Sequence, residues 1–251
     1  MPTKHLLLCI AGFFMYGCAA DVVLRDEHDL THRMVADRVD APIVIDGRLD
    51  EPVWATGPWY SLGVSLDRAA DGEALRDGGR VRLAWDDGHL YLAADFTDRD
   101  LVGGRDEDQV HHYLFGDLCE LFLKAQHSKH YWELYVTPRG RKTTLFLTES
   151  VKIDDAQSVS GLRVAARVNG TLDDPADEDR GWTAEMAVPV KDLTARGEPF
   201  GPNAPWRVFV GRYNHTVGSG PKGAELSMTP PLSVTSYHLT DQYAVLELRG
   251  R

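Results

Sequence analysis

The stretch GDLCELFLKAQHSKHYWELYVTP, residues 116–138, decides the fold because it predicts two strands joined by a short polar turn. Side chains of a strand alternate between its two faces. One face of this hairpin has only side chains suited to a core, namely Cys119, Leu121, Leu123, Trp132, Leu134 and Val136. The other face mixes carboxylates with aromatic rings, namely Glu120, Phe122, Tyr131, Glu133 and Tyr135. The first face predicts a hydrophobic core, and the second needs a separate explanation.

Two explanations fit the mixed face. Exposed aromatic rings usually cover something, and a sugar offers C–H faces that lie on rings and hydroxyl pairs that donate to a carboxylate. Alternatively, a loop of the same chain covers the face, and the rings belong to the interior. These residues alone favour neither explanation.

Composition sets the class of protein. The chain has 251 residues, of which 43% are hydrophobic and 26% are charged, as expected for one globular domain. Its formal net charge of -11 argues against binding nucleic acid through clustered Lys and Arg, and a neutral ligand fits better. Cys9 and Cys18 lie near the amino terminus, so Cys119 has no partner for a disulfide and is predicted to be a buried small apolar residue.

The amino terminus has the pattern of an export signal. Lys4 and His5 precede an apolar run at residues 6–15, which is too short to span a bilayer but has the length of a secretory signal. Gly17-Cys18 resembles the cleavage box of bacterial lipoproteins, in which the cysteine becomes lipidated; cleavage after Ala20 is the alternative. Residues 1–20 are therefore predicted to be a signal peptide. The protein is expected to be secreted or periplasmic, or attached by a lipid on Cys18 to the outer membrane or cell surface, facing away from the cytoplasm.

The rest of the chain predicts one all-β domain. Residues 21–40 are interpreted as a tether, although residues 35–39 alternatively begin the first strand, and residues 41–251 form the domain. Apart from the hairpin, strands are expected at residues 43–45, 81–85, 90–96, 143–147, 162–168, 182–188, 206–213 and 243–248, with a helical turn at 190–195 and Trp54 and Trp85 in the core. Many short alternating strands favour an antiparallel β-sandwich of the immunoglobulin or jelly-roll type over a barrel.

Seven segments occur in the order seen in a known family. They are IDGRLDEPVW, VRLAWDDGHLYLAADFTD, GDLCELFL, YWELYVTPRG, VNGTLDDPADEDRGWTAEMAVPVKDL, PWRVFVGRYN and SYHLTDQYAVLEL. Together, across residues 43–248, they resemble family 9 carbohydrate-binding modules and their extracytoplasmic relatives in the DOMON-like superfamily. The resemblance implies a β-sandwich that binds carbohydrate without catalysing a reaction.

The resemblance also implies a binding site. Members of the family hold a sugar between two aromatic rings, and the second of these falls on Tyr237, which is followed by His238. The first falls near Leu114, where Tyr113 or Phe115 would have to supply the ring. We expect the ring of Tyr237 to be an exposed platform outside the core. The polar residues of such sites fall on the mixed face of the hairpin, at Glu120, Glu133 and Tyr135.

Two other functions compete with carbohydrate binding. Glu120 and Glu133 could be the acid and base of a glycoside hydrolase. Some relatives hold haem for electron transfer through Met and His, for which this chain offers Met186, Met228 and His238, although Met186 alternates into the core. No other cofactor is expected.

Metal binding has two candidate segments. His111, His112, His127 and His130 match no standard zinc pattern. The acidic loop at residues 173–179 could take a structural calcium ion, as in some relatives, or be solvated, which its missing ligand pattern favours.

Overall fold

The hairpin at residues 116–138 forms as predicted in the computed structural model of the chain, which describes residues 32–155, 158, 160–220 and 223–250. Strands β5 (Leu118–Ala125) and β6 (His130–Val136) are antiparallel, with Glu120 opposite Tyr135 and Phe122 opposite Glu133. The predicted signal peptide, Cys18 and residues 21–31 of the predicted tether lie outside the described residues.

The described residues form an all-β domain. Its other strands are β1 (Arg33–Arg38), β2 (Tyr60–Ser61), β3 (Gly79–Trp85), β4 (His89–Phe96), β7 (Lys142–Thr148), β8 (Arg163–Asn169), β9 (Gly181–Pro189), β10 (Trp206–Asn214), β11 (Glu225–Thr229) and β12 (Ala244–Arg249). Hydrogen bonds join the twelve described strands into one sheet in the order β7-β6-β5-β10-β12-β1-β3-β4-β9-β8, with β11 on β10 and β2 on β3.

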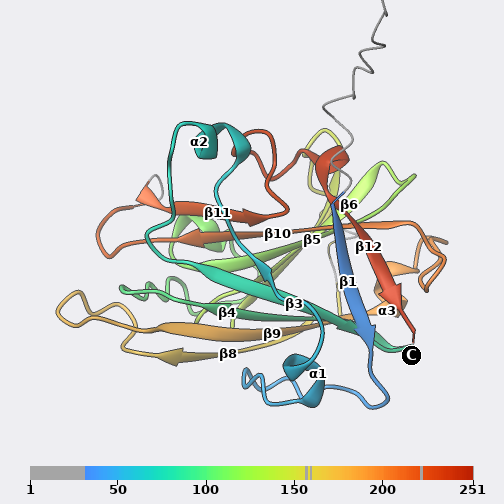
Figure 1. Ribbon diagram of the computed structural model, residues 1–251, viewed down its shortest axis with the longest axis horizontal. Helices are drawn as coiled ribbons and strands as arrows, with labels where there is room; N and C mark the ends of the chain where they lie inside the picture. The colour runs from blue at the N-terminus through green and yellow to red at the C-terminus, as the bar shows by residue number, and fades with distance from the viewer. Residues whose placement is uncertain (1–31, 156–157, 159, 221–222, 251) are drawn as a thin grey trace, which may run out of the picture. The chain divides into compact units, whose positions relative to one another are not determined.

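This continuous sheet differs from the expected sandwich of two separate sheets, which is not confirmed. Figure 1 shows β10, β11 and β5 above β4, β9 and β8, with β1 and β12 running steeply beside them. β1 pairs in parallel with both β12 and β3, so it links the two layers by hydrogen bonds, and β6 approaches β8 and β9 on the other side. The sheet is therefore nearly barrel-shaped.

Strand β1 corrects the interpretation of residues 21–40 as a tether. Met34, Val35 and Ala36 are buried, and the strand lies between two neighbours in the sheet, so residues 33–38 belong to the domain. This agrees with the alternative in which residues 35–39 begin the first strand. The strand expected at residues 43–45 is wrong: Ile43 is buried against Trp54, but its segment pairs with no described strand.

The main hydrophobic core lies inside the curled sheet. It contains the core face predicted for the hairpin, including Cys119, whose thiol is free and fully buried. Trp85 belongs to the same core, whereas Trp54 packs in a smaller cluster outside β4 and donates its indole N–H to Glu185 at 3.0 Å. Both tryptophans are buried, as predicted.

Helices are short. They are α1 (Pro52–Ala55), α2 (Leu66–Ala70), α3 (Val190–Leu193) and the 3₁₀ turns η1 (His112–Leu114) and η4 (Thr240–Gln242). The predicted helical turn at residues 190–195 is confirmed by α3 for its first four residues. None of the helices in the described part of the chain is long and apolar enough to cross a membrane.

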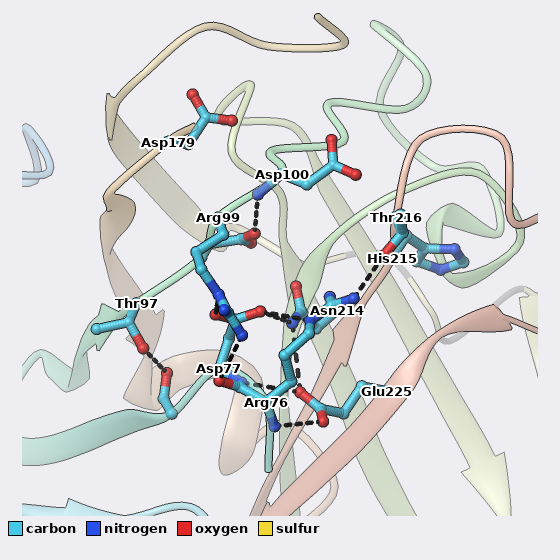
Figure 2. Close-up of polar contacts among 12 residues, drawn as sticks. Arg76, Asp77, Thr97, Arg99, Asp100, Asp179, Asn214, His215, Thr216 and Glu225 are labelled. Atoms are coloured by element: carbon cyan, nitrogen blue, oxygen red, sulfur yellow. Dashed lines mark hydrogen bonds and ion pairs between the residues drawn. The ribbon is translucent and has the colours of Figure 1, made fainter. Parts of the chain in front are cut away.

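A cluster of paired charges lies where β3, β4 and β10 end or begin, and we call it the arginine cluster (Arg76, Asp77, Asp98, Arg99 and Arg212). Arg212 and Asp98 form a fully buried ion pair at 2.8 Å. Figure 2 shows Asp77 between Arg76 and Arg99, each of which donates Nε–H to one carboxylate oxygen, at 2.7 and 2.8 Å respectively. These partners neutralise the buried carboxylates of the cluster.

Candidate functional site

The mixed face of the hairpin forms the floor of a pocket of about 420 Å³, which we call the hairpin pocket. Strands β5, β6, β7, β10 and β11 contribute to it, with the segment 235–238 above them and the turn around η1 at one end. Its lining residues are His111, Tyr113, Glu120, Glu133, Tyr135, Leu145, Leu147, Val151, Ile153, Tyr213, Leu226, Thr235, Ser236, Tyr237 and His238. Its volume lies in the range of small-molecule sites, about 300–1,000 Å³.

Six of the seven predicted site residues line this pocket, namely Tyr113, Glu120, Glu133, Tyr135, Tyr237 and His238. The seventh, Phe115, does not: its ring is exposed and lies under the guanidinium of Arg105 at 4.7 Å. The difference follows from η1, because consecutive residues of a 3₁₀ turn point about 120° apart. Tyr113 therefore faces the pocket, with its ring centroid 5.9 Å from that of Tyr213, while Leu114 and Phe115 face outward.

Glu120 and Glu133 are both buried in the pocket floor. The Tyr135 hydroxyl donates to Oε1 of Glu133, and Oε2 of Glu133 is buried without a hydrogen-bond partner among the described residues. Burial raises the pKa of Glu133 to about 7. Burial, and then the nearby charge of Glu133, raise the pKa of Glu120 well above its usual value, and a hydrogen bond from Tyr135 opposes this only in part. The two carboxyls therefore hold protons at pH values where exposed ones have lost them.

His238 closes one side of the pocket. Its Nδ1 lies 2.9 Å from the hydroxyl of Tyr131 and 3.9 Å from Oε2 of Glu133. Burial lowers the pKa of His238, so the neutral imidazole is favoured at pH 7. His238 therefore hydrogen-bonds with Tyr131 and brings no positive charge to the two carboxyls at pH 7.

The position of Tyr237 corrects the expectation of an exposed platform. Its side chain is 5% exposed, and its hydroxyl lies 2.9 Å from the carbonyl oxygen of Arg212 and 2.8 Å from that of Ser227. A Cβ at Gly211, which stands opposite Glu120 in β10, would overlap the ring of Tyr237. The ring therefore lies flat on the sheet as a buried wall of the pocket.

The mixed face of the hairpin is divided between two environments. Phe122 and Tyr131 pack in an outer hydrophobic cluster with Leu232, Tyr237 and Tyr243 from the end of the chain, which cover them as a loop of the same chain would. The carboxylates and Tyr135 remain at the pocket. Covering by the chain itself therefore accounts for one half of the face, and the pocket occupies the other.

Sequence reasoning missed several lining residues. Tyr213 could have been found, because Phe209, Gly211 and Tyr213 alternate along β10 onto the face of Glu120. The apolar rim beyond β7 could not have been found, because no sequence pattern near Val151 and Ile153 predicts that they lie beside the hairpin. Val151 has φ of 58°, a conformation that is costly for a β-branched residue and often marks a functional site.

The three candidate haem ligands, Met186, Met228 and His238, do not lie together in one site. Met186 is buried in the main core, whereas Met228 belongs to the outer cluster, where its sulfur accepts a hydrogen bond from the Leu232 N–H at 3.4 Å. His238 is engaged with Tyr131.

The candidate metal segments have other contacts. No group of three or more His, Cys, Asp or Glu within the described ranges is arranged to hold a metal ion. In the acidic loop, Asp179 accepts from the N–H groups of Leu101 and Thr171, both at 2.7 Å, and Asp173 pairs with Arg139. These contacts tie the loop to the sheet; calcium binding there stays a prediction.

Comparison with known proteins identifies the family. The model of the carbohydrate family 9 binding domain-like family matches residues 45–202. No curated protein matches the chain as a relative. A crystal structure of a candidate carbohydrate-binding protein from Bacteroides uniformis has the same fold, with a TM-score of 0.67 at 11% identity, covering 87% of this chain and 99% of that one. A family 9 carbohydrate-binding module from Caldicellulosiruptor kristjanssonii has a TM-score of 0.60 at 15% identity in two structures. Both alignments cover 87% of this chain. They cover 94% of the module in the structure with cellotriose and 96% of it in the structure with glucose. Since the family model spans more than half of the sequence, the chain belongs to the carbohydrate family 9 binding domain-like family.

Proposed function

We propose that the protein is an exported, non-catalytic carbohydrate-binding protein that holds a saccharide in the hairpin pocket. One observation is the main support: in a chain of this family, a pocket combines tyrosine rings with two carboxyls that have few protein partners. The module from Caldicellulosiruptor kristjanssonii, which has the same fold, is known with cellotriose and with glucose bound.

The pocket offers both kinds of contact that a saccharide needs. The rings of Tyr113 and Tyr213 provide apolar faces for sugar C–H groups. Oε2 of Glu133 is free to accept from a hydroxyl, or to donate to one when protonated. Val151 and Ile153 add an exposed apolar rim, where a second sugar unit would leave the pocket.

A glycan array probed with the full chain tests this proposal, and titration calorimetry with the retained saccharides then measures affinity. We expect retention of at least one saccharide and competition by the free sugar. Failure to retain any glycan, with the protein shown to be folded by circular dichroism, would overturn the proposal.

Hydrolysis is the second candidate function because Glu133, with a pKa of about 7, has the property of a general acid and lies beside Glu120. Family membership favours binding without turnover. Incubation with the bound saccharide and assay of reducing ends separates the two: binding predicts no release, and hydrolysis predicts release with a bell-shaped pH profile.

Export and anchoring rest on residues 1–20 alone. The proposed lipid on Cys18 would hold the domain at a membrane surface outside the cytoplasm. Labelling cells that express the full chain with a radioactive fatty acid tests this, with Cys18→Ser as the control. Equal labelling of both chains, or none of either, would leave export as a soluble protein after cleavage at Ala20.

A further inference from the structure

The two pocket carboxyls are exceptional among the buried acids of this protein. Seven acidic side chains are buried in the described residues: Asp77, Asp98, Asp117, Glu120, Glu133, Asp179 and Glu185. Five of them accept at least one N–H hydrogen bond; for example, Glu185 accepts from the backbone of Asp46 and Gly47 and from the Trp54 indole. Asp117 accepts from the backbone of Val102 and His215. Among the residues that the structure describes, Glu120 and Glu133 accept from no N–H group, only from the hydroxyl of Tyr135.

The pocket also lacks a cation. None of its lining residues within the described ranges is Lys or Arg. Arg212 is nearby in sequence, but it points to the opposite face of β10 and pairs with Asp98. Buried carboxylates are normally paired, because an unpaired buried charge is costly. Within the described residues, the two pocket carboxyls therefore lack both N–H donors and a positively charged partner.

We propose that the hairpin pocket selects a saccharide bearing a primary amine, whose ammonium group donates to Glu133 and Glu120. This inference rests on the proposed function and names the class of sugar. An ammonium group has three N–H donors and a full positive charge, so it supplies both of the missing elements. Oε2 of Glu133 is an acceptor to which no group in the described part of the chain donates.

The aromatic walls fit the same ligand. The ring centroids of Tyr113 and Tyr213 are 5.9 Å apart, and those of Tyr213 and Tyr237 are 5.7 Å apart with the planes nearly perpendicular. Several rings set at angles around a site are the usual arrangement for an organic cation, which is attracted to ring faces. A neutral sugar would use the rings equally well but would leave the carboxyls without a charge partner.

Binding of an amine should release protons. Burial raises the pKa of both carboxyls, and the ammonium requires at least one of them as a carboxylate. Within the described residues, the titratable groups around them are Tyr131 and Tyr135 from β6, Tyr213 from β10, His111 and Tyr113 near η1, Tyr237, His238 and Tyr243, with Cys119 next to Glu120 in β5. Burial raises the pKa of these tyrosines further from neutrality and lowers that of His238. Affinity for the amine should therefore rise between about pH 5 and about pH 7 as Glu133, whose pKa is about 7, ionises.

Titration calorimetry on the full chain tests the proposal with three sugars that differ only at one carbon: glucosamine, glucose and N-acetylglucosamine. We expect glucosamine to bind at least about tenfold more tightly than glucose, as one charge-assisted contact predicts. N-acetylglucosamine, whose nitrogen is uncharged, should lose this preference. In Glu133→Gln, the preference for glucosamine over glucose should be smaller than in the natural protein, because one of the two carboxyls that accept from the ammonium is lost.

Two controls keep the result interpretable. Glu247→Gln removes an exposed carboxylate from the same acidic protein, so it should keep the preference for glucosamine if the preference arises in the pocket rather than from net charge. If Glu133→Gln is poorly folded by circular dichroism, Glu120→Gln provides the same comparison. Equal affinity of the natural protein for glucosamine and glucose would overturn this inference and leave the proposed function intact. Binding of none of the sugars on the array would overturn the proposed function itself.

Discussion

Two different kinds of buried acid lie on the two sides of the sheet at β10, and the contrast separates structure from function. On the inner face, Arg212 stands opposite Cys119 in β5 and forms the closed ion pair with Asp98. On the outer face, one residue away, Gly211 stands opposite Glu120, and no Lys or Arg from residues 32–155, 158, 160–220 or 223–250 pairs with Glu120 or Glu133. Removing the partner of a buried acid destabilises the fold, whereas unpaired acids in a pocket mark a candidate binding site.

The largest effect is expected from breaking the inner pair. Arg212→Met would leave Asp98 buried without its cation and would also remove donors to the carbonyl oxygens of Gly78 and Thr97. Losing one member of a buried pair costs about 3–5 kcal/mol of the free energy of unfolding. Denaturant unfolding followed by fluorescence measures this. Arg141→Met, which breaks an exposed pair with Asp106, should have a far smaller effect; similar losses in both would mean that burial does not distinguish the pairs.

The second-largest loss of stability is expected from truncating Tyr237 on the outer face. Because its ring is buried between Gly211 and Phe209 and its hydroxyl is satisfied, Tyr237→Ala should cost about 3–4 kcal/mol of stability through the cavity that it leaves. Tyr237→Phe, which keeps the ring and loses only hydrogen bonding, should cost about 1 kcal/mol. Thermal and denaturant unfolding of both variants decide this. A Tyr237→Ala protein as stable as the natural one would restore the exposed platform that the sequence suggested.

Tyr237 shows where prediction from the sequence stops. The alternation in residues 116–138 correctly gave the inner and outer faces of the hairpin, since the two-residue period is a local property of a strand. Whether the outer face meets solvent depends on Leu232, Tyr237 and Tyr243, which come from a segment about a hundred residues later. No local pattern contains that contact.

For the sheet as well, local features were predictable and long-range contacts were not. Most strands were found from alternation and turn residues, and β3 and β4 form the expected hairpin. The closure by β1 was missed because parallel pairing joins residues far apart in the chain, such as Ala36 and Leu83, without a turn to signal it. The same limit applies to the pocket: six lining residues were predicted from the family resemblance, but the burial of its carboxyls was not.

The unpaired acids should make stability depend on pH. The pKa of Glu133 is about 7 in the folded protein and near 4.5 when the chain is unfolded. Between these values the folded state holds a proton that the unfolded state has lost, so raising the pH favours unfolding. The natural protein should therefore lose up to about 3 kcal/mol relative to Glu133→Gln between about pH 4.5 and about pH 7, and no more above that window. Unfolding of both proteins across this range measures the difference. A constant difference would mean that Glu133 ionises normally and that the outer face is not distinct from the inner one.

The smallest effect separates the two aromatic residues beside Leu114. Tyr113 lines the hairpin pocket with its ring against Tyr213, whereas Phe115 lies outside it beneath Arg105. Tyr113→Ala should weaken saccharide binding by about 1–2 kcal/mol, roughly tenfold, because one ring face is lost, and Phe115→Ala should not change it. Neither residue belongs to a hydrophobic core, so the thermal midpoints should stay close to that of the natural protein. Calorimetric titration of both variants with the same saccharide gives the comparison. Weaker binding in Phe115→Ala but not in Tyr113→Ala would mean that the turn at η1 presents its opposite side to the ligand. In that case the saccharide would bind outside the pocket that contains the unpaired carboxyls.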